Sequence, residues 1–300
     1  MKTMKTILLA SVLLSLGACK NNRNDFDAAG TFEATEIIVS SQANGEIMRF
    51  EAEEGKKLTA GEEIGYIDTL QLYLKKRQLQ ASMKSVRSRM SDINKQIAAT
   101  QEQISTAEKE KARYENLLRQ NAGTQKQVDD WDSQLRILRK QLAAQLSTLE
   151  RGNSGLTEES SATEIQIAQI DDQLRKSRIV SPIDGTVLVK YAEKGELANQ
   201  GRPLFKIADT ENIYLRAYVV ASQLTEMKIG QKVSVFADSG KEGRREYKGT
   251  ISWISDKAEF TPKTIQTRDE RANLVYAVKI ALKNDGYIKI GMYGEMKTGN

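Results

Sequence analysis

Histidine is absent from the 300 residues, cysteine occurs once and proline three times, so several classes of protein can be excluded at once. Without histidine, the chain lacks the usual proton shuttle of hydrolases and the commonest zinc ligand. A lone cysteine cannot form an intramolecular disulfide or a cysteine-cluster metal site. With 28% charged and 39% hydrophobic residues, the chain is also not a polytopic membrane protein. We therefore expect no catalytic residues, no metal and no cofactor.

The N-terminal segment has the features of a secretory signal. Two lysines precede an apolar run at 7–18, and these 12 residues are too few to cross a bilayer, which takes about 20. Residues 16–19, LGAC, resemble the lipobox of bacterial lipoproteins and contain the only cysteine. We predict that residues 1–18 are a signal peptide and that Cys19 is the lipid attachment site; an ordinary signal with a chance cysteine is the alternative. The polar residues 19–29 are expected to form a tether.

Residues 70–177 are nearly free of glycine and proline, and their apolar residues have coiled-coil spacing. Steps of alternately four and three residues from Leu79 to Leu118 meet twelve positions, of which ten are apolar or aromatic. A period of 3.5 residues held over five heptads is typical of a left-handed coiled coil. The pattern breaks at 119–123 and resumes at Val128, which predicts two antiparallel helices joined by a turn.

The two arms of this hairpin differ in their expected continuity. The first, 70–118, reads as one helix of roughly 70 Å at 1.5 Å per residue. The return arm contains RGNSGL at 151–156, whose two glycines are expected to break the helix. A hinge that lets the hairpin flex is the alternative at that position.

The segments on either side of the hairpin, 30–69 and 178–210, resemble each other. Each has three glycines at intervals of ten and six residues, between short alternating apolar runs. These glycines are Gly45, Gly55 and Gly61 in the first segment and Gly185, Gly195 and Gly201 in the second. Such runs predict β-strands, with glycine at tight turns that need φ above zero. The pattern favours a quasi-twofold β-sandwich that the hairpin divides in sequence.

From about Glu211 to residue 300 the sequence is a succession of short alternating runs without a long helical pattern. We expect a small antiparallel β-barrel there, completed by an early strand around Gly30–Ala34. The predicted fold class is therefore α+β: a long antiparallel coiled-coil hairpin inserted into a split β-sandwich, followed by a β-barrel.

These residues resemble a known family, the periplasmic adaptor or membrane fusion proteins of the haemolysin D (HlyD) type. SPIDGTV at 181–187 and KGELANQGRPLF at 194–205 are similar to its split biotinyl/lipoyl-like domain, and the resemblance covers nearly the whole body of the chain. Residues 253–280 are similar to the barrel of a short subgroup that serves ABC-type exporters. The end of the chain at Asn300 favours that subgroup over adaptors of resistance-nodulation-division (RND) pumps, which usually continue into a further domain.

The resemblance implies a function. Such a protein is the adaptor subunit of a tripartite efflux or secretion system, linking an inner-membrane transporter to an outer-membrane channel of the TolC type. It implies an ABC-type transporter, with the RND type as the alternative, and a homo-oligomer, taken as a hexamer. The expected location is the periplasmic face of the inner membrane, to which the protein is lipid-anchored.

The resemblance also implies a site at the hairpin tip. In the family an Arg, a Leu four residues later and a Ser seven beyond that dock onto the channel; this sequence has Arg113, Leu117 and, at the Ser position, Thr124. Arg113 and Leu117 stand beside the seam residues Tyr114 and Leu118, so we expect them to face outward. Thr124 also begins the pattern TQKQ, which fits a capping box for the return helix, and both roles stay open.

Two rival functions can be compared with the adaptor. A lipoyl carrier presents its modified lysine on the turn between the two halves, but here the long hairpin replaces that turn. A lipid-anchored coiled-coil spacer between membrane and cell wall is the stronger alternative. The adaptor is favoured because a spacer needs neither the split sandwich nor the barrel.

Overall fold

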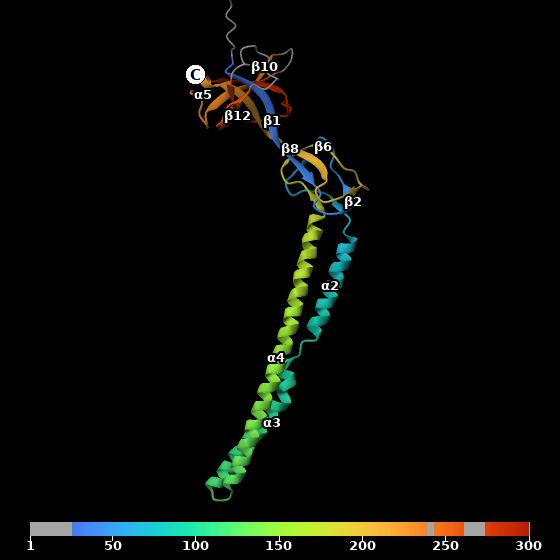
Figure 1. Cartoon of the computed structure of the whole chain (residues 1–300), viewed down its shortest axis with the longest axis vertical. Coiled ribbons are helices and arrows are strands. Elements are labelled where there is room, and N and C mark those ends of the chain that lie inside the picture. Colours follow the sequence, from blue (N-terminus) through green and yellow to red (C-terminus); the bar gives the residue numbers. More distant parts are fainter. Residues whose placement is uncertain (1–25, 239–242, 261–273, 300) are drawn as a thin grey trace, which may run out of the picture.

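A computed structural model of the chain describes residues 26–238, 243–260 and 274–299 (Figure 1). Three parts follow one another along the long axis: a β-barrel at one end, a β-sandwich in the middle and a helical hairpin at the other end. The predicted α+β class is confirmed. The predicted signal peptide, 1–18, and Cys19 lie outside the described residues.

The elements divide between these three parts as follows. The sandwich and barrel contain β1 (Ala28–Ser40), β2 (Gly45–Phe50), β3 (Lys57–Leu58), β4 (Glu63–Ile67), β5 (Arg178–Val180), β6 (Gly185–Lys190), β7 (Leu197–Ala198), β8 (Pro203–Val220), α5 (Ala221–Leu224), β9 (Lys232–Asp238), β10 (Arg244–Ile254), β11 (Glu259–Phe260), β12 (Leu274–Lys283) and β13 (Tyr293–Thr298). The hairpin contains α2 (Leu70–Ser88), α3 (Ile93–Arg119) and α4 (Gln125–Lys176).

The expected break in the return arm is wrong, because α4 runs for 52 residues straight through 151–156. The interruption lies in the first arm instead, between α2 and α3, about halfway along the hairpin (Figure 1). A glycine inside a helix costs only about 1 kcal/mol. The contacts of α4 with both α2 and α3 can offset that cost, so α4 forms the continuous spine of the hairpin.

The predicted coiled-coil seam is confirmed. All twelve positions from Leu79 to Leu118 are buried or half-buried. The two polar ones have partners on α4: Thr100 Oγ1 donates to Gln145 Oε1 at 3.0 Å, and Lys111 is paired with Asp132. The seam therefore tolerates two polar layers because each is hydrogen-bonded across the hairpin.

The sandwich has the expected internal twofold relationship, and equivalent residues are 140 positions apart. The amide of Gly201 donates to the carbonyl oxygen of Ser41 at 2.8 Å, and that of Gly61 donates to Ser181 at the same distance. Five of the six predicted turn glycines have positive φ. Gly185 is the exception, since its φ is not positive. A Cβ at this position would lie 2.4 Å from the backbone oxygen of Ala208. Glycine is needed at this position for close strand packing and not for a turn.

The barrel is closed by β1, β8, β12, β10, β9 and β13, with β12 paired to both β10 and β8. The early strand expected near Gly30 is part of β1, which pairs with β8 and β13. The core of the barrel includes Phe32. Its ring packs so closely on Gly294 that a Cβ added there would lie only 2.6 Å from it. Because β1 and β8 run through both barrel and sandwich, two continuous strands connect these parts (Figure 1).

Candidate docking sites

The turn at the hairpin tip is a Schellman motif that ends α3. The amide of Asn121 donates to the carbonyl oxygen of Leu118 at 3.0 Å, and that of Ala122 donates to Leu117 at 2.9 Å. Asn121 has a φ of 56°, the left-handed conformation that this motif requires and that Asn tolerates better than most residues. The turn is thus fixed by backbone hydrogen bonds, and it holds the end of α3 in a defined orientation.

Arg113 and Leu117 come together at this tip. Both line a shallow hollow on the outer surface of α3, together with Lys109, Ala112, Asn116 and Gln120. The Arg113 side chain is 70% exposed, and among the described residues it forms an ion pair with Glu110 alone, at 3.6 Å. Such an exposed ion pair contributes little to stability, so the guanidinium can leave Glu110 and bind a partner at a small cost in free energy. Leu117 is half-buried and not fully outward as expected.

Thr124 has the expected capping position but does not line the hollow. It is the N-cap of α4, and the Gln127 side-chain oxygen accepts hydrogen bonds from the Thr124 amide and hydroxyl, each at 3.0 Å. This is the reciprocal half of a capping box. Helix capping is therefore enough to explain threonine at position 124 without any partner protein. The role of Thr124 in channel docking stays a prediction.

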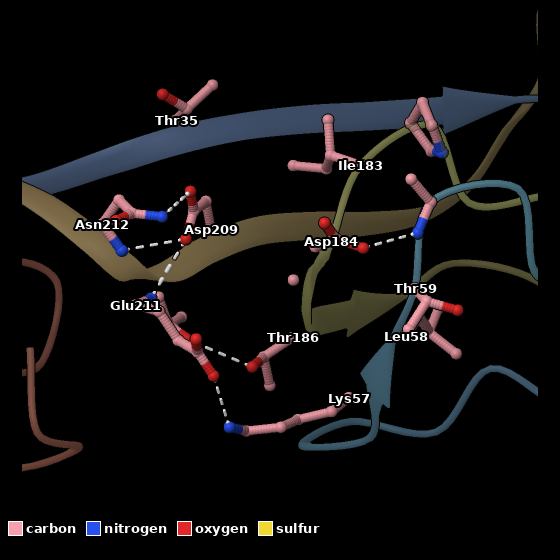
Figure 2. Close-up of a pocket in the computed structure, with 14 residues that line it drawn as sticks. Thr35, Lys57, Leu58, Thr59, Ile183, Asp184, Thr186, Asp209, Glu211 and Asn212 are labelled. Carbon is pink, nitrogen blue, oxygen red and sulfur yellow. Dashed lines mark hydrogen bonds and ion pairs between the residues drawn. The ribbon is translucent and has the colours of Figure 1, made fainter.

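A second concave region lies where the sandwich meets the barrel. Two adjoining hollows of about 640 and 710 Å³ share Lys57, Thr186, Thr210 and Glu211. Figure 2 shows Lys57 reaching toward the Glu211 carboxylate, at an Nζ–Oε1 distance of 2.8 Å. Both side chains are more than 70% exposed, so this ion pair crosses the junction without holding it firmly.

Asn284, directly after β12, holds the barrel to the same junction more firmly than the Lys57–Glu211 ion pair does. Its side-chain amide donates to the carbonyl oxygens of Thr210 and Ile288, both at 2.9 Å. Its backbone amide donates to the oxygen of Glu211, also at 2.9 Å. The loop after β12 is thereby fixed to β8 where the two shared strands leave the sandwich. No sequence pattern pointed to this contact, because Thr210 and Glu211, its partners at the junction, are about 75 positions away.

Within the described ranges, no group of three or more Asp, Glu, His or Cys side chains is arranged to hold a metal ion. No helix among them is both long enough and apolar enough to span a bilayer. The fold presents a long rod with the Arg113–Leu117 hollow near one end and a β-barrel at the other.

A hairpin inserted into a split lipoyl-like sandwich and followed by a barrel defines a periplasmic adaptor. The chain belongs to this family: the model described as "RND MFP, barrel-sandwich hybrid domain", where MFP stands for membrane fusion protein, matches residues 35–210, more than half of the chain.

Solved structures show the same fold. MacA from Actinobacillus actinomycetemcomitans is 20% identical with a TM-score of 0.55, over 90% of this chain and 76% of that one. A MacA-MexA chimeric protein containing the Pseudomonas aeruginosa MexA α-hairpin domain is 22% identical with a TM-score of 0.53, over 91% and 81%. At these identities the likeness establishes the fold alone.

Family membership decides between the functions that the sequence left open. Its members are non-enzymatic adaptors of tripartite efflux systems, which work with inner-membrane transporters and TolC-type channels. The prediction that the chain is an adaptor and not an enzyme is therefore confirmed. A structural spacer without transport is disfavoured for the same reason.

Proposed function

We propose that this adaptor is lipid-anchored through Cys19 and couples an inner-membrane ABC-type transporter to a TolC-type outer-membrane channel. The observation that carries the proposal is the separation of the two docking ends (Figure 1). The α4 spine alone is about 80 Å long at 1.5 Å per residue, and it holds the Arg113–Leu117 hollow far from the barrel. An arginine fork beside an exposed apolar surface suits a groove lined with carbonyl or carboxylate oxygens.

The type of transporter rests on a different observation. Residues 253–280 resemble the barrel of the short ABC-associated subgroup. The matched domain description names adaptors of RND pumps, which makes an RND transporter the second candidate.

A ring of copies of this chain, taken as six, would allow weak contacts at each hairpin tip to hold the channel. When several hairpins engage one channel, each contact after the first is intramolecular, and the overall affinity rises far above that of a single tip. An exposed Arg and a half-buried Leu on each tip are then enough to hold the channel, although a single such pair would bind weakly.

The direct test is affinity purification of the native protein from gently crosslinked membranes, followed by mass spectrometry. We expect an inner-membrane permease or ATPase together with an outer-membrane channel. An ABC permease confirms the transporter type, whereas an RND pump replaces it with the second candidate. Recovery of the protein alone, or of cell-wall proteins alone, would contradict the coupling role.

The anchor is tested separately. Replacement Cys19→Ser is expected to release the protein from the membrane fraction while the barrel and hairpin remain folded. If that variant stays in the membrane fraction in cells that lack the transporter, Cys19 is not the anchor.

A further inference from the structure

One face of the barrel gathers aromatic and cationic side chains from four strands, with Thr31 of a fifth strand between them. In the strand register Trp253 (β10) lies opposite Lys279 (β12), Lys279 opposite Arg216 (β8), Arg216 opposite Thr31 (β1), and Thr31 opposite Tyr293 (β13). These residues form one row across the outer surface of the barrel. Trp253 is 38% exposed and Tyr293 is 56% exposed. In a chain with only 6% aromatic residues, such a concentration on one surface calls for an explanation.

The two cations of this row differ in their surroundings. The Lys279 ammonium lies over the rings of Tyr214 and Trp253, at 4.5 and 5.7 Å from their centroids, and forms no ion pair within the described part of the chain. Arg216 is paired with Glu259 through one nitrogen at 3.2 Å. Its Nε is buried and, within the same described part, has no hydrogen-bond partner.

The register places the two cations of the row side by side. Lys279 and Arg216 are directly opposite each other on neighbouring strands, where like charges repel, and Glu259 offsets only the charge of Arg216. A carboxylate at Lys279 would neutralise the one of these two cations that has no ion pair within the described residues. The aromatic rings beside it would lower the local dielectric and strengthen that contact.

The composition indicates what would supply the carboxylate. Trp, Tyr and Arg gathered on one surface are typical of the energetic centre of a protein–protein interface. An anionic lipid surface fits less well, because Glu259 lies within this face and would be repelled. Of the carboxylates that a second copy could offer, Asp285 and Glu295 of the barrel are already paired with Arg245 and Arg244.

We propose that this row, Trp253, Lys279 and Arg216 with the flanking tyrosines, binds a carboxylate-bearing periplasmic segment of the inner-membrane transporter. The inference rests on the proposed adaptor function and adds to it the surface and the chemistry of the transporter contact. The aromatic rings would pack against the apolar part of that segment, and Lys279 would receive its carboxylate.

The test uses the charge reversal Lys279→Glu in the full-length lipoprotein. Recovery of the transporter from crosslinked membranes is expected to fall at least about tenfold, since the contact between residue 279 and the partner's carboxylate becomes repulsive. The melting temperature is expected not to fall, because the new carboxylate lies opposite Arg216. The control Lys248→Glu changes the charge of another exposed barrel lysine on β10, outside the row, and should leave recovery unchanged.

A photo-crosslinking residue at position 253 identifies the partner directly. We expect it to capture a transporter peptide containing Asp or Glu, whereas the same residue at position 248 should not. Capture of this chain itself, or loss of self-association in Lys279→Glu, would replace the transporter with a second copy. Binding of anionic lipid vesicles that Lys279→Glu abolishes would replace it with the membrane.

Two outcomes separate this inference from the proposed function. If native protein recovers the transporter and Lys279→Glu recovers it equally well, the adaptor function stands and this surface is wrong. If native protein recovers no transporter at all, the adaptor function itself fails, and the transporter-binding role of this row fails with it.

Discussion

The side chain of Asn153 and the backbone of Ser91 exchange two hydrogen bonds across the hairpin. The Ser91 amide donates to Asn153 Oδ1 at 2.9 Å, and Asn153 Nδ2 donates to the Ser91 carbonyl oxygen at 2.8 Å. Ser91 lies between α2 and α3, where its backbone groups have no helical partner. The side-chain amide of Asn153, on the continuous helix α4, therefore provides partners for both the N–H and the C=O of Ser91 at the interruption of the other arm.

Replacement Asn153→Ala should destabilise the hairpin. It leaves a half-buried amide and carbonyl of Ser91 without partners, which costs about 1–3 kcal/mol of unfolding free energy. Urea unfolding followed by helical circular dichroism measures the change. Asn94→Ala, at an exposed site on α3, should change it by less than about 0.5 kcal/mol. Equal effects of the two variants would show that the Ser91 contact contributes nothing specific.

The helical glycines of α4 should be replaceable. A Cβ added at Gly152 or Gly155 meets no atom within 4 Å, and both residues are within the helix. Alanine is expected to raise the unfolding free energy by about 0.5–1 kcal/mol at each site, because it restricts the unfolded backbone more than glycine does. Export should be unchanged in both variants. Lost export with a more stable hairpin would restore the hinge interpretation of 151–156.

At the hairpin tip, Leu117→Asp should abolish export without lowering protein level or lipidation. The carboxylate would replace the apolar surface of the hollow that Arg113 shares. Ile137→Asp is the matched control, since Ile137 is 57% exposed on α4, outside the tip hollow. Export assays with both variants check the prediction, with helical circular dichroism confirming that the half-buried Leu117 site still folds. Normal export by Leu117→Asp would remove the tip from the docking site.

The Lys111–Asp132 pair should make hairpin stability depend on pH. The hydrogen bond from Lys111 holds the pKa of the Asp132 carboxyl below its usual 3.8, and the same bond raises the pKa of Lys111 above 10.5. The contribution of Asp132 is therefore present above about pH 4 and is lost as the pH falls through its folded pKa. The contribution of Lys111 is present below about pH 10 and is lost as the pH rises further.

Replacement Asp132→Asn tests whether the contribution of Asp132 to stability is lost at low pH. We expect the variant to unfold at a lower urea concentration than the native protein at about pH 7, and the difference to shrink as the pH falls through the folded pKa of Asp132. A difference that stays the same however far the pH is lowered would mean that packing, and not charge, explains the effect.

The sequence by itself determined the hairpin and its seam, because a 3.5-residue period is a local property that only one helix geometry satisfies. It also determined five of the six glycine turns, since positive φ is a requirement of the residue's own backbone. The tip pair, Arg113 and Leu117, came from the family resemblance and stays a prediction, and the sequence adds only that residues four apart on a helix share one face.

Tertiary structure decided the rest, in each case through partners distant in sequence. The interruption falls in the first arm because Asn153, 62 positions away, satisfies Ser91. Gly185 is required by the approach of Ala208, and not by its own φ. The row of Trp253, Lys279 and Arg216 exists only because the strand register places three distant segments side by side. Local periodicity fixes which elements form, whereas strand register and cross-hairpin hydrogen bonds fix which side chains meet.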